Sequence, residues 1–286
     1  MYKIIIVLIL VSTFFSCSLD KFIIRQSSIL LDYGSIALYE ETDLVIAEQA
    51  LASNIKLLEG MVKGDPENCE LLLLTSQAIS GYVLGFVEDE EPERAKPLYL
   101  RARDYAARVL KQNDFNLTEE NLLIEQYQKN VASIEDEDID ALFWSAFCWA
   151  GWINLSLDNP QAFVDLPKVE SLMNRVLEID SSYYHGAALL FFGGIWGTKP
   201  KMLGGDPEKA KQYFDKNLEI TNGNFLLTYV YYAKYYAAKI LEEDLFKQYL
   251  KTVKDTPNDV LPGEQLLNAI AKKKADFLLA RTEDLF

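Results

Sequence analysis

Side chains that commonly perform catalysis are scarce in this sequence. It has one histidine, His185, which excludes metal sites built from paired or clustered histidines. Neither the glycine-rich phosphate-binding motifs nor the G-x-S-x-G hydrolase motif is present. His185 follows Tyr183 and Tyr184 where a helix is expected to begin, and we interpret it as a surface or capping residue rather than a general base. These residues predict no catalytic site, no metal site and no cofactor.

Two runs of acidic residues are the other candidates for chemistry. Residues 88–91 (EDEE) and 135–138 (EDED) each come just before an expected helix. Negative charge is favourable there, because the free amide groups of a first helical turn carry partial positive charge. Neither run has the ligand spacing of a calcium-binding loop. We expect both runs to be solvated helix caps, which disfavours a hydrolase that uses paired carboxylates.

Aromatic residues are the unusual feature of the chain, and most of the candidate binding residues come from them. The candidates are Tyr229, Tyr232 and Tyr236 on one helical face, Lys234 between them in the sequence, and the pair Trp149 and Trp152 on an almost wholly apolar helix. Tyr231 and Tyr235 lie on another face, close to Lys234. One aromatic face per helix is enough for a core, so a second face must pack against something else. Two interpretations stay open: packing between repeats, or a groove or pore that accepts an apolar ligand or a partner.

A glycine-rich segment adds four further candidate binding residues, Trp196, Met202, Gly204 and Gly205. The glycine pairs 193–194 and Gly204-Gly205 enclose a stretch that contains Trp196 and Met202. The segment is too short for a domain linker, and it lacks a lysine at the offset that phosphate binding requires. We expect a structured loop that places Trp196 and Met202 at a surface opening.

The composition excludes several classes of protein. Of 286 residues, 50% are hydrophobic and 25% are charged, which is typical of a chain that folds around a core. Lys and Arg number 28 against 43 Asp and Glu, so the formal net charge is −15. A surface this negative repels phosphate backbones, and we expect no nucleic-acid partner. The 9 prolines and 14 glycines are few for a fold with many tight turns, which favours an all-α protein.

The N-terminus has the features of a secretory targeting segment. A short cationic start precedes an apolar run at 4–15, which at about 1.5 Å per residue spans roughly 18 Å, too short for a hydrocarbon core of about 30 Å. Ser16-Cys17 resembles the cleavage site of bacterial lipoproteins. We predict a signal peptide at 1–16, an acylated Cys17 that anchors a periplasmic protein to a membrane, and a spacer at 17–41. The alternatives are an uncleaved anchor and ordinary secretory cleavage nearby.

Apolar helical stretches are expected to form the interior. The stretch 141–155 is too short to span a bilayer and has two polar residues, Ser145 and Asn154, so we expect a helix buried on most sides. The remaining cysteines, Cys69 and Cys148, lie in such stretches. They could pair in an oxidising compartment, but we expect two buried free thiols.

Start signals for helices recur along the chain. An acidic or amide residue precedes proline at Asp65-Pro66, Glu91-Pro92, Asn159-Pro160 and Asp206-Pro207. Proline suits the first position of a helix, where its missing N–H would have no partner, and a preceding Asp or Asn can accept a hydrogen bond from the first turn. The sequence therefore predicts helices that begin at these prolines.

The predicted helices resemble one another in pairs. Small and aromatic residues recur at spacings of four and three, as in the second helix of a tetratricopeptide repeat (TPR). We predict one domain at 42–286, a TPR-like α-solenoid of antiparallel helix pairs with units at about 43–112, 139–180, 182–222 and 224–255. A capping helix is expected from about Pro262 to Arg281, with Lys272–Lys274 mostly facing solvent.

Several segments resemble a known family, the T-component of tripartite ATP-independent periplasmic (TRAP) transporters. They are residues 86–89 (FVED), 93–95 (ERA), 99–103 (YLRAR), 204–210 (GGDPEKA), 224–228 (NFLLT) with Tyr235-Tyr236, and 267–272 (LNAIAK). The resemblance covers nearly all of the chain from Ala47 to Leu279. It implies a lipid-anchored periplasmic protein of TPR-like helices that associates with the substrate-binding P-component, forms a homo-oligomer with openings for a ligand, and has no catalytic residues.

The function that we expect follows from this resemblance and from the aromatic residues. It is a non-enzymatic accessory of a TRAP transport system that docks the solute-binding P-component and receives a hydrophobic or organic-acid ligand. The alternative is a general TPR adaptor lipoprotein of envelope assembly, with no ligand of its own.

Overall fold

The computed structural model describes residues 21–118, 122–199, 202 and 204–286, and within them the protein is all-α, without a β-strand, which confirms the predicted fold class. The predicted signal peptide and Cys17 lie outside these residues. The α-helices are α2 (Ser28–Tyr39), α3 (Leu44–Gly64), α4 (Cys69–Tyr82), α5 (Pro92–Gln112), α6 (Ile124–Ala132), α7 (Ile139–Leu155), α8 (Pro160–Ile179), α9 (Tyr183–Thr198), α10 (Pro207–Thr221), α11 (Leu227–Tyr232), α12 (Glu243–Asp255), α13 (Gln265–Leu279) and α14 (Thr282–Leu285).

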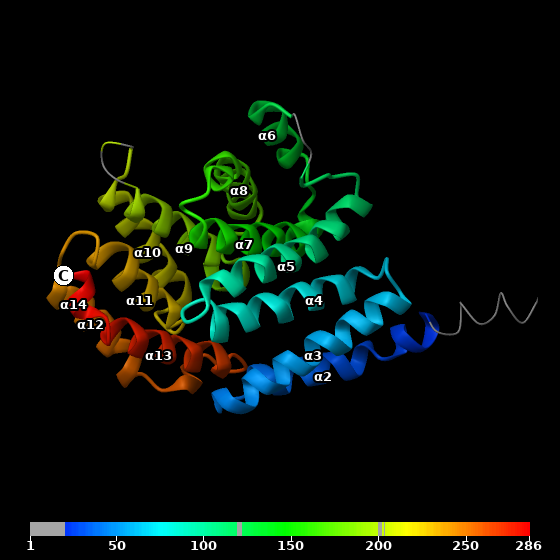
Figure 1. Cartoon of the computed structure of the whole chain (residues 1–286), viewed down its shortest axis with the longest axis horizontal. Helices are drawn as coiled ribbons and strands as arrows, with labels where there is room; N and C mark the ends of the chain where they lie inside the picture. Colours follow the sequence, from blue (N-terminus) through cyan, green and yellow to red (C-terminus); the bar gives the residue numbers. More distant parts are fainter. Residues whose placement is uncertain (1–20, 119–121, 200–201, 203) are drawn as a thin grey trace, which may run out of the picture.

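Consecutive helices pack against one another along a curved path. Helices α4, α7, α9 and α11 form an inner row, and α5, α8, α10 and α12 form an outer row. In Figure 1 the chain runs from α2 and α3 (blue) through α7 (green) to α13 (red), and α13 comes back to contact both α2 and α3. The inner row therefore faces a space that α2, α3 and α13 close from the other side. Whether these pairs are TPR repeats stays a prediction.

The capping signals work at three of the four predicted positions. Helices α5, α8 and α10 begin at the expected prolines, and the side chains of Asn159 and Asp206 accept hydrogen bonds from the first turns of α8 and α10. The prediction at Asp65-Pro66 is wrong, because α4 begins at Cys69, where Asn68 accepts a hydrogen bond from the amide of Leu71. The side chain of Asp65 instead contacts the N-terminal segment, where Arg25 donates a hydrogen bond to it at 2.8 Å.

In the described part of the chain, two of the four passages from the inner row to the outer row contain a π-helical turn. The first, η1 (Val83–Val87), continues α4 before α5, and the second, η4 (Ala233–Ala237), continues α11 before α12. A π-helical turn inserts an extra residue into an α-helix and is frequent at functional sites. Glu88, which follows η1, and Tyr235, which lies within η4, both line the enclosed space.

The core extends through the inner row. Ala141 and nine further residues of α7 are buried, which fits the predicted helix covered on most sides. Smaller clusters surround Phe214 and Phe246 of the outer row, and Ile270 of α13. Among the described residues, one helical stretch, Cys69–Val87, is long and apolar enough to cross a membrane, but 61% of its apolar window is buried in the protein, as in a core helix.

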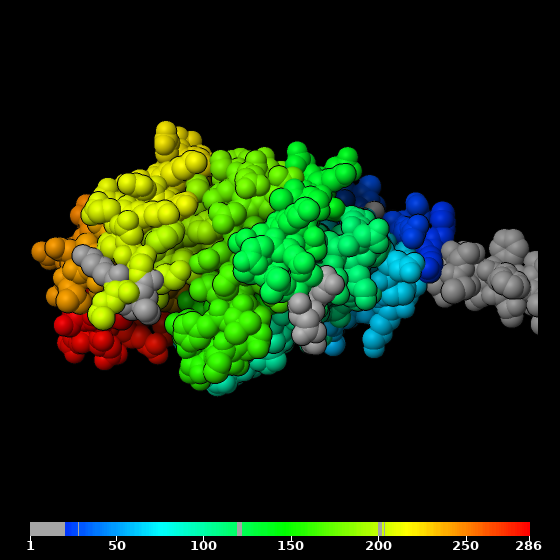
Figure 2. Space-filling view, turned by 90° about the horizontal axis from the view of Figure 1, so that it is seen from above, coloured from blue at the N-terminus to red at the C-terminus, as the bar shows by residue number. Residues whose placement is uncertain are grey.

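The N-terminal region differs from the sequence interpretation. The predicted spacer contains α2, whose exposed apolar side chains include Ile29, Tyr33 and Ile36. Figure 2 shows this region (blue) at one end of the molecule and the C-terminal region (red) at the other. Both described cysteines are free as expected, but Cys69 is exposed rather than buried, because it lies on the first turn of α4.

Candidate functional site

A cavity of about 810 Å³ lies inside the curve of the helices. Its wall is built mainly from α2, α3, α4, α7, α9, α11 and α13, so it is the space that the inner row faces. Small-molecule sites are usually cavities of roughly 300–1,000 Å³. The size and position of this cavity make it the candidate site.

Most of the wall is apolar, and one part of it is aromatic. The aromatic part consists of Trp144, Phe147, Tyr184, Phe191, Tyr231 and Tyr235. The rings of Trp144 and Tyr184 meet edge to face with their centroids 4.7 Å apart, and Tyr231 lies 5.8 Å from Tyr235. Rings that pack against each other in this way lose little freedom when a ligand covers them, so the wall is preorganised for an apolar molecule.

The cavity is open to the surface. Four apolar side chains of its wall, those of Leu30, Leu57, Leu157 and Phe163, are each more than half exposed to solvent. They come from α2, from α3, and from the connection of α7 to the first turn of α8. A molecule can therefore reach the cavity from solvent along apolar side chains.

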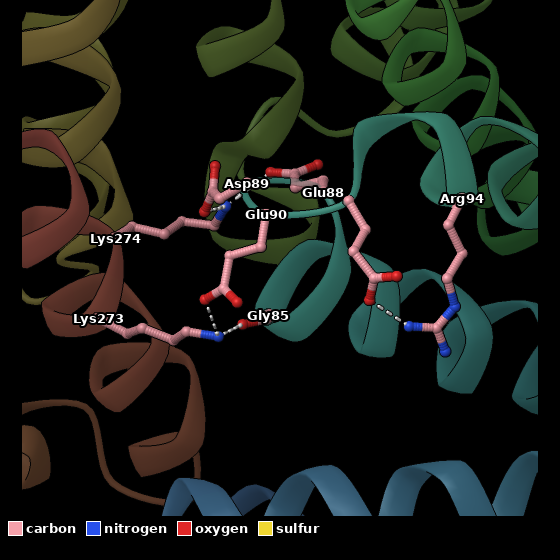
Figure 3. A network of polar contacts seen from close by, with 8 residues as sticks. Gly85, Glu88, Asp89, Glu90, Arg94, Lys273 and Lys274 are labelled. Carbon is pink, nitrogen blue, oxygen red and sulfur yellow. Dashed lines mark hydrogen bonds and ion pairs between the residues drawn. The ribbon is translucent and has the colours of Figure 1, made fainter. Parts of the chain in front are cut away.

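A charged group interrupts the apolar wall directly after η1. The carboxylate of Glu88 lines the cavity and accepts hydrogen bonds from Lys274 Nζ, at 2.7 Å, and from the hydroxyl of Tyr99, at 2.5 Å. Lys274 also donates to Asp89, at 2.7 Å. Figure 3 shows Lys274 reaching from α13 to the turn that carries both carboxylates. Glu88 is thereby fixed in one position on the wall.

Lys274 is buried, with 4% of its surface exposed. Burial lowers the pKa of an ammonium group, but Glu88 and Asp89 raise the pKa of Lys274 by more, so the net shift is upward and the side chain is charged at neutral pH. The expectation that Lys272–Lys274 mostly face solvent is therefore wrong for Lys274. The expectation of a solvated cap is likewise wrong for Glu88 and Asp89, because Lys274 pairs with both.

The tyrosine hydroxyls around the cavity are neutral groups. Burial raises the pKa values of Tyr99, Tyr184 and Tyr231 well above the ordinary value, and the nearby Glu88 adds to the effect for Tyr99 and Tyr231. These three tyrosines therefore keep their protons throughout the physiological pH range. Tyr99 donates its hydrogen to Glu88, and the hydroxyl groups of Tyr184 and Tyr231 each have one donor and an acceptor oxygen. The wall combines apolar area with a few fixed polar atoms, which is how small-molecule sites orient a ligand.

A left-handed turn places Tyr184 on the wall. Tyr184, His185 and Gly186 have φ values of 44°, 57° and 66° at the start of α9. Residues other than glycine rarely adopt such values, so the turn must be held by its surroundings. The buried amide of Asn217 donates to the carbonyls of His185, at 2.7 Å, and of Gly186, at 2.9 Å, and accepts from Thr228, at 2.5 Å.

The tyrosines predicted to bind a ligand lie on the wrong face of α11. Tyr232 is fully buried between α11 and the outer row, where its ring stacks on Phe214 at 4.8 Å and on Tyr249 at 4.5 Å. Tyr229 and Tyr236 also pack there and do not line the cavity. The lining face is the one with Tyr231 and Tyr235, and Lys234 lies beside it with its ammonium 5.1 Å from the ring of Tyr235.

The two predicted tryptophans of α7 are core residues. Trp149 is 2% exposed, donates to Asp165 at 3.2 Å and packs under the guanidinium of Arg103 at 5.1 Å. Trp152 is buried as well and does not line the cavity. The lining residues of α7 include their neighbour Trp144 and the small residue Gly151.

The glycine-rich segment does not reach the cavity wall at the predicted residues. The ring of Trp196 is covered by the ammonium of Lys209, 3.7 Å from its centroid, and Met202 is 97% exposed. Gly204 has a φ of 86°, and a side chain on Gly205 would collide with the carbonyl of Lys199. The glycines are thus explained by backbone geometry.

The fold and the site together define an all-α protein in which stacked helices enclose an apolar, solvent-accessible cavity with a carboxylate on its wall. The sequence model of the TRAP transporter T-component matches residues 40–286, so the chain belongs to this family. The family suggests an accessory role in a TRAP transporter. A comparison with curated proteins found no match.

Sequence reasoning missed the residues that make up the charged part of the site. Glu88 and Lys274 are 186 residues apart, and each belongs to a run of like charges that reads as a solvated surface. One signal was present: consecutive helical residues point about 100° apart, so three successive lysines on an amphipathic helix cannot all face solvent. That signal identifies a buried lysine without identifying its partner.

Proposed function

We propose that this protein is a periplasmic accessory subunit of a TRAP transporter that holds an apolar small molecule in its cavity and docks the solute-binding P-component. The observation that carries the proposal is the apolar cavity of about 810 Å³ in a chain of the T-component family. Membership of the family implies association with a TRAP transporter, and the apolar side chains of the cavity wall support an apolar ligand.

The wall supports an apolar ligand on energetic grounds. Each methylene group that leaves water for an apolar surface contributes about 0.8 kcal/mol to binding. A chain of eight buried methylenes would therefore gain roughly 6 kcal/mol before the cost of immobilising it. Rings and aliphatic side chains on several helices cover the ligand from more than one side.

The exposed apolar side chains at the cavity opening support docking of a partner. Leu30, Leu57 and Phe163 belong both to the wall and to the surface. Exposed apolar side chains of this kind mark interaction sites when they gather around a groove. A P-component that docks over them would receive the ligand directly from the cavity.

Anchoring by an acylated Cys17 completes the proposal. Cys17 precedes the helical residue Lys21 by four positions in the sequence. Acyl chains at Cys17 would hold the protein at the membrane surface that faces the periplasm. A homo-oligomer with aligned openings is part of the same proposal.

Sedimentation of the purified full chain, mixed with a purified P-component of a TRAP transporter from the same organism, tests the docking. We expect a complex that is heavier than either protein alone. A mixture in which both proteins sediment at their individual rates at micromolar concentrations would contradict the proposal and favour the adaptor role in envelope assembly.

A further inference from the structure

The cavity wall has one charged side chain that is mostly buried and held in place by hydrogen bonds. Among the described lining residues, the ionisable side chains other than tyrosine are those of Glu88 and Lys199. Lys199 is about one third exposed and has Glu170 at 3.6 Å and the ring of Trp196 at 5.7 Å as partners. Glu88 has 13% of its side chain exposed, and it is therefore the charged group that a buried ligand would meet.

The hydrogen-bonding capacity of Glu88 is partly used. One oxygen accepts from Lys274 and the other accepts from Tyr99. An ionised carboxylate has about four acceptor sites and no donor, so acceptor sites remain on both oxygens. A ligand atom that meets Glu88 inside the cavity must bring its own hydrogen to form a bond.

The nearby donors, Lys274 and Tyr99, do not remove the need for a hydrogen atom on the ligand. The ammonium of Lys274 is bonded to both Glu88 and Asp89, and Lys274 is not part of the wall. The hydroxyl hydrogen of Tyr99 is already donated to Glu88. A ligand carboxylate placed here would face the Glu88 carboxylate with no hydrogen between them, and like charges in contact are strongly unfavourable.

We propose that the cavity takes a long-chain molecule whose polar end donates hydrogen bonds and carries no negative charge, and that Glu88 accepts a hydrogen bond from that end. This inference rests on the proposed function of the cavity as a ligand site, and it decides between the hydrophobic and organic-acid ligands in favour of the former. The aromatic wall packs against the chain, and Glu88 selects the polar end.

Calorimetric titration of the full chain with two ten-carbon probes, 1-decanol and decanoate, at pH 8 tests the inference. The apolar parts of the probes are matched, so the difference reports the polar end. We expect decanol to bind at least about tenfold more tightly than decanoate, because a site that cannot pair an anionic group rejects it.

The variant Glu88→Gln assigns the preference to this residue. Glutamine keeps an acceptor oxygen for Lys274, its amide nitrogen can donate to the hydroxyl oxygen of Tyr99, and Lys274 keeps Asp89 as a partner, so we expect a folded protein. The side-chain amide can donate to a carboxylate, and the preference for decanol should fall to about threefold or less. Glu90→Gln is the matched control: it removes the same charge from the same turn at an exposed side chain, and the preference should stay as in the unmodified protein.

Three results would overturn the inference. Decanoate that binds the unmodified protein as tightly as decanol shows that Glu88 does not select the polar end. A preference that persists in Glu88→Gln assigns the selection to another group. Absence of binding for both probes contradicts the proposed function of the cavity itself, which separates that failure from a wrong choice of polar end.

Discussion

Filling the cavity from within should abolish ligand binding without harming the fold. Gly81 of α4 lines the cavity, and a Cβ atom at this position would meet no other atom within 4 Å. The substitution Gly81→Phe therefore places a benzyl group in open space inside the cavity. Gly151, another lining glycine, is unsuitable, because a Cβ there would lie 2.7 Å from the ring of Tyr99.

We expect the substitution at Gly81 to weaken ligand binding and to leave the free energy of unfolding unchanged or higher. A benzyl group that displaces three ligand methylenes removes about 2.4 kcal/mol, which weakens binding roughly fiftyfold. Replacing a helical glycine restricts the unfolded chain, so Gly81→Ala should raise the free energy of unfolding by about 0.5–1 kcal/mol. Gly81→Phe should be at least as stable as the unmodified protein.

Titration with 1-decanol measures the binding, and urea denaturation measures the stability. Gly60→Phe is the matched control, because Gly60 is a helical residue of α3 that also has no atom within 4 Å of a Cβ, but it is exposed and does not line the cavity. Unchanged binding in Gly81→Phe would refute the cavity as the site. Equal losses in both variants would show that decanol binds the surface.

Three further predictions concern the residues that shape the site. Tyr232→Ala should lower the free energy of unfolding by about 3–5 kcal/mol in urea denaturation, because the ring is fully buried. Tyr231→Ala should mainly weaken decanol binding in calorimetry, because Tyr231 lines the cavity. The reverse pattern would contradict the assignment of the two faces. Asn217→Ala should lower the free energy of unfolding by about 2–4 kcal/mol in thermal or urea denaturation, because it removes the side-chain donor to the buried carbonyl of Gly186 and the partly buried carbonyl of His185. A loss below about 0.5 kcal/mol would show that the left-handed turn does not need this amide. The hydrogen bond from Arg25 lowers the pKa of Asp65 below its ordinary value of 3.8. The contact therefore stabilises the N-terminal segment at pH values above 3.8, and this stabilisation is lost as the pH falls further and Asp65 is protonated. Hydrogen exchange in the N-terminal segment that does not increase between pH 5 and pH 2.5 would contradict this.

The helices were predictable because their signals are local. Asn159-Pro160 and Asp206-Pro207 each combine a side-chain acceptor with a proline that fits the first helical position, and both helices begin there. At Asp65-Pro66 the same local signal failed, because Arg25 donates to Asp65 from 40 residues away. The local pattern cannot show that a side chain has a distant partner.

The sequence analysis chose Tyr229, Tyr232 and Tyr236 as binding residues, whereas the face that lines the cavity carries Tyr231 and Tyr235. The spacing of the tyrosines in α11 and η4 defines two faces, one with Tyr232 and one with Tyr231. Which face is buried depends on Phe214 and Tyr249 of the outer row, whose rings stack on Tyr232. Helical periodicity separates faces, but the tertiary partners decide which face lines the cavity.

The charged part of the site was beyond local reasoning for a different reason. Glu88 and Lys274 are brought together when α13 returns to the turn after η1, and that return depends on the curvature of the whole stack. Runs of acidic or basic residues are usually solvated, and a buried charge is stable when a partner compensates for its lost hydration. Such a partner is visible only in the folded chain.

Native mass spectrometry of the full chain, purified in mild detergent from its own membrane, tests the central claim most directly. We expect one molecule with a long apolar chain and no acidic group to accompany each protein chain, and we expect Gly81→Phe to remove it while Gly60→Phe does not. A protein that arrives without a bound molecule, and that takes up no decanol when the probe is added, would contradict the claim that the cavity is a ligand site.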